Sequence, residues 1–198
     1  MSSKTGNWKN YCVTLIFLII NVAVYIFYII AGERVFDIGS LSADTVIGDG
    51  EFYRLITCTF LHADAAHIVG NMIFAVGLGE MLEREAGHWR FAVLYLVSGL
   101  GGSLFSLTYM VMSAQNYRSV GASGAISGLI GALLVLVLAN NGRYGAVSLG
   151  RIILGICYMI YTGVQSTTTD NAAHIGGLVC GFLVMLIMQL VRRGRSNP

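Results

Sequence analysis

The sequence predicts an all-α integral membrane protein with six transmembrane helices, which form one domain over residues 1–198. Charged residues make up 11% of the chain, whereas soluble domains carry about 25%. The mean hydropathy is +0.72, and the apolar residues gather in stretches close to the length of about 20 residues that a helix needs to cross a bilayer. The single proline, Pro198, is the last residue, so no proline-rich linker divides the chain.

Six apolar stretches follow one another along the chain with polar connections between them. The first follows basic residues, as a signal peptide does. Its apolar run is too long for one and no small-residue cleavage site follows, so we expect a retained helix. The fifth stretch is the weakest, because Arg151 lies near its start. The predicted spans are 11–31, 67–83, 89–112, 120–139, 148–164 and 172–191.

The basic residues predict how these spans are oriented, because Lys and Arg gather on the cytoplasmic side of membrane proteins. With a cytoplasmic N-terminus, nine basic residues lie in inner segments and three in outer ones, and the opposite orientation reverses this ratio. Both termini are therefore expected in the cytoplasm. The long acidic connection 32–66 is then outside, where its Leu, Phe and Tyr residues pack on one another or lie in the interface. The nine inner residues are Lys4, Lys9, Arg84, Arg90, Arg143, Arg151, Arg192, Arg193 and Arg195, and the three outer ones are Arg34, Arg54 and Arg118.

Several kinds of ligand are not expected from the composition. A net charge of +2, without a basic patch, does not indicate nucleic-acid binding. The four cysteines are scattered, without the spacing of a disulfide framework or a zinc site. His62 and His67 have no carboxylate or cysteine partner nearby in the sequence, so they do not indicate zinc either. We expect no metal, no cofactor and no nucleic acid.

Polar residues begin three of the six spans, although polar groups inside a bilayer are costly. His67 and Asn71 begin the second span with a spacing of four residues, which places them on one helix face. Ser123 lies at the start of the fourth span and His174 at the start of the sixth. Even-numbered spans enter from outside in the predicted orientation. All these polar residues are therefore expected near the outer membrane face.

Small residues lie beside Ser123 and His174, and such helix faces let backbones approach closely in lipid. In the fourth span, Ser123 is followed by Ser127 and Gly131 at intervals of four. In the sixth, glycine follows His174 three and seven residues later. Close packing of the two faces would bring the Ser123 hydroxyl within hydrogen-bond reach of the His174 ring.

These residue types can supply the chemistry of a serine hydrolase. A serine hydroxyl becomes nucleophilic when an adjacent base takes its proton, and histidine has the side chain whose pKa lies nearest working pH. The backbone N–H of Ser123, at a helix N-terminus, together with Asn71 and His67, can donate hydrogen bonds to an oxyanion. Asp170 either orients His174 or caps the sixth helix, and capping is the favoured interpretation.

The chain resembles the rhomboid family of intramembrane serine proteases from about residue 50 to residue 181. The matching segments are Tyr53-Arg54-Leu55, Phe60-Leu61-His62, His67-Ile68-Val69-Gly70-Asn71, Gly79 with Glu83, Gly121-Ala122-Ser123-Gly124, and Ala173-His174-Ile175-Gly176-Gly177 with Gly181. The resemblance implies a six-helix bundle and a catalytic dyad of Ser123 and His174 without a third acid. It implies oxyanion donors at His67, Asn71 and the Ser123 backbone.

The same resemblance implies structural roles outside the dyad. Arg54 would steady the outer connection and Glu83 the inner end of the second span. The glycines of the matching segments, Gly121, Gly124, Gly177 and Gly181, would support the site. The substrates implied are single-span membrane proteins, cut in or near the outer part of their helix, and the location expected is a bacterial inner membrane.

One position departs from the family pattern, and two other functions compete with proteolysis. Many members have an aromatic residue where this chain has Ser127, so a neighbouring aromatic such as Tyr158 or Tyr161 would have to orient His174. A transporter would use the same polar residues, but the inner half of the fourth span, 133–139, is wholly apolar and offers no path. An inactive relative that only binds membrane helices would not need both Ser123 and His174.

Overall fold

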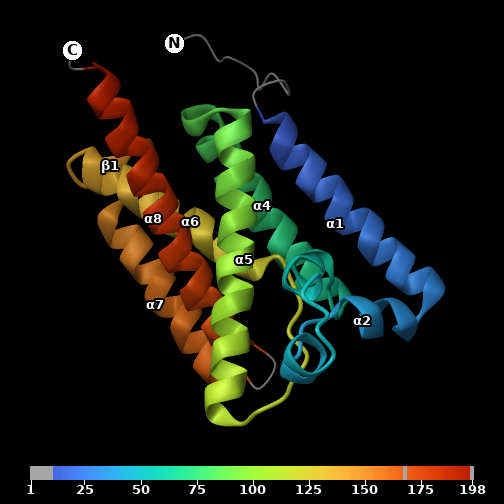
Figure 1. Ribbon diagram of the computed structural model, residues 1–198. Coiled ribbons are helices and arrows are strands. Elements are labelled where there is room, and N and C mark those ends of the chain that lie inside the picture. Colours follow the sequence, from blue (N-terminus) through green and yellow to red (C-terminus); the bar gives the residue numbers. More distant parts are fainter. Residues whose placement is uncertain (1–10, 167–168, 197–198) are drawn as a thin grey trace.

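The computed structural model describes residues 11–166 and 169–196, and helices form most of this part of the chain (Figure 1). Each predicted span corresponds to one helix, with ends that differ from the prediction by a few residues. Lys4 and Lys9, which enter the charge count, lie outside the described residues. The six helices are α1 (Cys12–Ala31), α4 (Ala65–Ala86), α5 (His88–Ser113), α6 (Ser123–Ala139), α7 (Leu149–Gln165) and α8 (Asn171–Ser196).

Four of these helices are long and apolar enough to cross a membrane: α1, α4, α5 and the Asn171–Gly194 part of α8. The other two, α6 and α7, are apolar but have 17 residues each, at the lower limit for a bilayer span. The chain is therefore an all-α membrane protein, while six spans and cytoplasmic termini remain predictions. The first turn of α1 and the last turns of α8 lie at the same end of the bundle (Figure 1).

The helix α6 packs against both α5 and α8, which also pack directly against each other. Twelve of its 17 residues are buried, as expected for a helix that is apolar on every side. Glycines make this packing close. A Cβ atom added to Gly177 or Gly181 of α8 would overlap the main chain of Gly124 or Gly128 in α6. In contrast, α1 lies at the edge and buries only Thr14 and Asn21.

The connection 32–66, which is predicted to lie outside and is called the outer connection below, folds on itself into short helices: α2 (Glu33–Gly39), η2 (Asp44–Gly48), α3 (Arg54–Thr57) and η3 (Cys58–Phe60). Arg54 is 6% exposed and holds this segment together. Its guanidinium donates to the carbonyl oxygens of Asp37 at 2.6 Å and Ser40 at 2.9 Å, and it pairs with the Glu51 carboxylate. Leu41 is fully buried. The connection therefore packs as a folded unit, one of the two arrangements predicted for it.

Two further contacts fix the connections at both ends of the bundle. Leu41 and Ser119 exchange main-chain hydrogen bonds of 3.0 and 2.8 Å, which attach the outer connection to the segment before α6. At the other end, an antiparallel hairpin of β1 (Arg143–Tyr144) and β2 (Val147–Ser148) joins α6 to α7.

Candidate active site

Ser123 is the first residue of α6 and follows a turn whose backbone conformation strongly favours glycine. Gly121 has a φ of +124°, which side-chain-bearing residues rarely adopt, and a Cβ atom there would lie 2.7 Å from the His67 ring. The Gly121 N–H donates to the Cys58 carbonyl at 2.9 Å, which attaches the turn to η3. Ser123 itself is partly buried. Its backbone N–H is one of those that a helix start leaves without an intrahelical acceptor.

His67 and Asn71 lie on the face of α4 beside this turn. The Asp64 carboxylate caps α4 by accepting the His67 N–H at 2.8 Å. Asn71 is 8% exposed, and among the described residues its buried Nδ2 has no hydrogen-bond partner. A Cβ atom at Gly121 would lie 3.6 Å from that Nδ2. A buried amide donor without an acceptor is uncommon, so Asn71 holds a free donor beside the start of α6.

His62 is a member of this group whose role could not be read from the sequence. It has no exposed surface, and its ring packs edge-on against that of His67 with centroids 5.1 Å apart. Burial, followed by the proximity of His67, lowers the pKa of His62 to about 4. His62 is thus a neutral packing partner that restricts the position of His67.

Asp170 caps the start of α8. Of the two roles considered for Asp170, capping the helix or orienting His174, the structure therefore confirms capping. One carboxylate oxygen accepts the Ala173 N–H at 2.9 Å, and the Asp170 carbonyl accepts the His174 N–H at 3.2 Å. The other carboxylate oxygen accepts the hydroxyls of Ser119, at 2.6 Å, and of Ser106. The carboxylate therefore fixes the backbone that carries His174.

The main chains next to Ser123 and His174 are in direct contact. A Cβ atom at Gly124 would lie 3.5 Å from the Ala173 carbonyl oxygen, and one at Gly177 would overlap the Gly124 main chain. Because Ser123 precedes Gly124 and His174 follows Ala173, the close approach of α6 and α8 includes the backbone next to these two residues. Among the described residues, no hydrogen bond joins the two side chains. The approach of the backbones is what connects them.

The aromatic residues expected to orient His174 do not do so in the described part of the chain. Tyr158 and Tyr161 are 67% and 63% exposed, and no ring contact between them and His174 is present there. The position that departs from the family pattern, Ser127, is buried and its hydroxyl donates to the Met159 Sδ of α7 at 3.3 Å. Among the described residues the buried Nδ1 of His174 has no hydrogen-bond partner.

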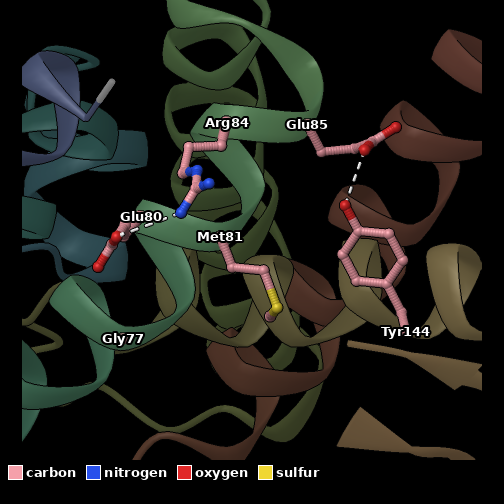
Figure 2. Close-up of a pocket in the computed structure, with 6 residues that line it drawn as sticks. All are labelled: Gly77, Glu80, Met81, Arg84, Glu85 and Tyr144. Carbon is pink, nitrogen blue, oxygen red and sulfur yellow. Dashed lines mark hydrogen bonds and ion pairs between the residues drawn. The ribbon is translucent and has the colours of Figure 1, made fainter. Parts of the chain in front are cut away.

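A hollow of about 420 Å³ lies far from these residues and is not part of the candidate site. Figure 2 shows its side chains, which come from the second half of α4 and from β1. The Tyr144 hydroxyl donates to the Glu85 carboxylate at 2.7 Å, and burial, followed by this bond, raises the pKa of Tyr144 to about 12. Since α4 rises 1.5 Å per residue, Glu80 lies about 20 Å along the helix from His67. The hollow is lined by Gly77, Glu80, Met81, Arg84, Glu85 and Tyr144.

Comparison with known proteins shows which family the chain is similar to. Residues 49–190 match the family described as the Rhomboid domain. The chain is 39% identical over 157 residues to RHOMBOID-like protein 5 of Arabidopsis thaliana, covering 77% of this chain and 50% of that protein. It is 35% identical over 151 residues to Rhomboid protease GluP of Bacillus subtilis, covering 76% of this chain and 29% of that protein. It is 32% identical over 197 residues to the YdcA protein of the same organism, covering 94% and 96%. The chain thus spans half or less of the first two proteins and nearly all of the third.

Proposed function

This chain belongs to the rhomboid family, and on that premise we propose that it is an intramembrane serine endopeptidase with Ser123 as nucleophile and His174 as general base. The observation that carries the proposal is the contact of the α6 and α8 main chains at Gly124, Ala173 and Gly177. It supports a meeting of the hydroxyl and the imidazole, since the two reacting residues flank it. The proposal requires the two side chains to form their hydrogen bond in the substrate complex, since catalytic hydrogen bonds that are long in the free enzyme often tighten there.

In the proposed reaction, the Ser123 hydroxyl oxygen attacks the scissile carbonyl carbon and its proton passes to the His174 ring. The carbonyl oxygen becomes an oxyanion, which accepts hydrogen bonds from the Ser123 N–H, the Asn71 amide and the His67 ring. The C–N bond then breaks, and the protonated His174 gives its proton to the leaving amine. Water, deprotonated by His174, hydrolyses the acyl-enzyme and releases Ser123. The free Nδ2 of Asn71 suits this role, because a donor already bonded elsewhere would have to break that bond first.

The proposed substrates are single-span membrane proteins, cut near the outer face of the bilayer. A helix hides its carbonyl groups in hydrogen bonds, so the substrate segment must unwind before Ser123 can attack. The outer location follows from the count of basic residues, which puts the N-terminal ends of α4, α6 and α8 outside. Lipid is the other proposed partner. The large apolar side chains exposed on α1 support this, because they would contact the lipid chains.

Labelling with a fluorophosphonate probe tests the nucleophile directly. The detergent-purified chain is expected to react at one serine, and Ser123→Ala is expected to remove the label. Ser127→Ala is the matched control, because Ser127 is a buried serine one helical turn away that is not expected to react. Label that persists in Ser123→Ala would refute the nucleophile.

Cleavage of a reconstituted single-span substrate tests the activity and the base. His174→Ala is expected to abolish cleavage while the variant stays helical and folded. A wild-type chain that retains the substrate helix but never cuts it would instead support a non-proteolytic binder of membrane helices.

A further inference from the structure

Three side chains with metal-ligand atoms meet at the end of the bundle opposite the candidate active site. They are Cys12, the first residue of α1, Glu83 in the last turn of α4, and His88, the first residue of α5. The Cys12 Sγ lies 3.5 Å from the His88 Nδ1 and 3.8 Å from the Glu83 Oε1. The last two atoms lie 2.5 Å apart. On α4, Glu83 is about 18 Å from Asn71 at 1.5 Å per residue.

The Glu83 carboxylate is buried and is held in place by several hydrogen bonds. It is 1% exposed. Its oxygens accept the Val13 N–H at 2.9 Å, and the Thr14 N–H and hydroxyl at 2.7 Å each. These donors are all neutral. In the described ion pairs its one partner is His88. A cation bound between Glu83, His88 and Cys12 would place a positive charge directly against this buried carboxylate.

The three ligand atoms nearly fit a tetrahedral zinc ion. With the usual zinc bond lengths, sulfur lies about 3.6 Å from a nitrogen or oxygen ligand, and nitrogen about 3.4 Å from oxygen. The two observed distances to Cys12 Sγ agree with these values. The distance between His88 and Glu83 has to increase by about 0.9 Å, which the His88 side chain can allow because it is 51% exposed.

We propose that Cys12, Glu83 and His88 form a binding site for a divalent transition-metal cation of the zinc type, with water as the fourth ligand. Thiolate, imidazole and carboxylate together favour zinc or cobalt over magnesium or calcium. Binding replaces the thiol proton of Cys12 and any proton on His88 Nδ1, and both are released to solvent.

A metal bound here would connect α1 to the turn between α4 and α5. The helix α1 buries few residues, and its contact with α4 is close at Thr14, where a Cβ atom on Gly79 would lie 2.6 Å from the threonine methyl. Glu83 already bonds Val13 and Thr14 of α1, and the metal would extend this link to Cys12 and to His88 at the start of α5. It would stabilise the folded state according to its concentration and affinity, since the unfolded chain does not assemble the site.

Cobalt binding to the full chain in detergent, with a non-thiol reductant present, tests the site without reference to proteolysis. The wild type is expected to bind one equivalent and to show a thiolate-to-cobalt charge-transfer band. Cys12→Ala should lose the band, whereas Cys157→Ala, which removes an exposed free cysteine, should keep it. Added zinc should displace the cobalt and abolish the band.

His88→Gln tests the second ligand. Loss of a residue that only hydrogen-bonds to a metal ligand lowers metal affinity by about 10–100-fold. His88 is proposed as a direct ligand, so His88→Gln should bind cobalt at least about 10-fold more weakly. The variant should keep a thiolate band, because Cys12 is still present. A wild type without the band, a band that survives in Cys12→Ala, or unchanged affinity in His88→Gln would each overturn the proposal. Equal melting temperatures of the metal-free variants and wild type would show that any loss is not one of folding.

Discussion

Replacing Asp170 by asparagine and by alanine separates the roles of its carboxylate at the start of α8. Asparagine keeps an oxygen that can accept the Ala173 N–H, and it caps helices as well as aspartate does. Its amide group cannot accept the hydroxyls of Ser119 and Ser106, which the carboxylate now holds. Alanine removes both sets of contacts. The pair of variants thus isolates the cap from the link to the two serines.

The expected magnitudes follow from these contacts. Exchanging two charge-assisted hydrogen bonds for neutral ones costs about 1 kcal/mol each, so Asp170→Asn should lower the free energy of unfolding by about 2 kcal/mol. Asp170→Ala also loses the cap, worth about 1 kcal/mol, and should be less stable than Asp170→Asn by at least that amount. Titration with a denaturing detergent in mixed micelles measures both differences.

Catalysis should respond much less to the asparagine variant than it would in a catalytic triad. In Ser-His-Asp proteases the same change lowers kcat by about 10⁴-fold. Here both carboxylate oxygens are engaged away from the His174 ring, so folded Asp170→Asn should keep kcat within about 10-fold of the wild type. A loss of about 1,000-fold or more in a folded protein would show that Asp170 acts on the imidazole and would refute this reasoning.

Three further changes test other parts of the structure. Asn71→Ala should lower kcat by about 100–1,000-fold, the usual effect of losing an oxyanion donor, with KM little changed; unaffected cleavage would remove Asn71 from the oxyanion site. Gly181→Ala should lower the melting temperature, at a cost of about 1–3 kcal/mol, because the added methyl overlaps the Gly128 main chain. Gly155→Ala, where nothing lies within 4 Å, is its control and should be neutral or stabilising. His62 has a lowered pKa of about 4, so the folded state binds fewer protons than the unfolded state, and stability should fall as the pH drops from about 6.5 towards 4. His62→Phe should reduce that fall, and an unchanged pH profile of the melting temperature would contradict it.

The helices and the small-residue faces could be predicted because their signals are local and periodic. The apolar stretches gave all six long helices, and the glycines of the sixth span do lie against the fourth. The start of the fourth span was placed three residues early, at 120 instead of Ser123. The reason is the turn at Gly121, whose positive φ no apolar pattern reveals.

The contacts that fix the candidate site could not be predicted, because they join residues far apart in the sequence. Asp170 holds Ser106 and Ser119, which lie 64 and 51 positions away. Cys12 and Glu83 are 71 positions apart, so no motif spacing could associate them. The pattern of hydrogen bonds around Arg54 runs mostly to main-chain oxygens, which any sequence supplies equally.

Ser119 belongs to two structures at once: its main chain pairs with Leu41 of the outer connection, and its hydroxyl is bound by the carboxylate that caps α8. Ser119 therefore links the connection 32–66 to the start of α8. A movement of the connection 32–66 must either carry Ser119 with it or break the main-chain pairing of Ser119 with Leu41. In the first case Ser119 pulls on the carboxylate that caps α8, so the connection and the backbone that carries His174 move together.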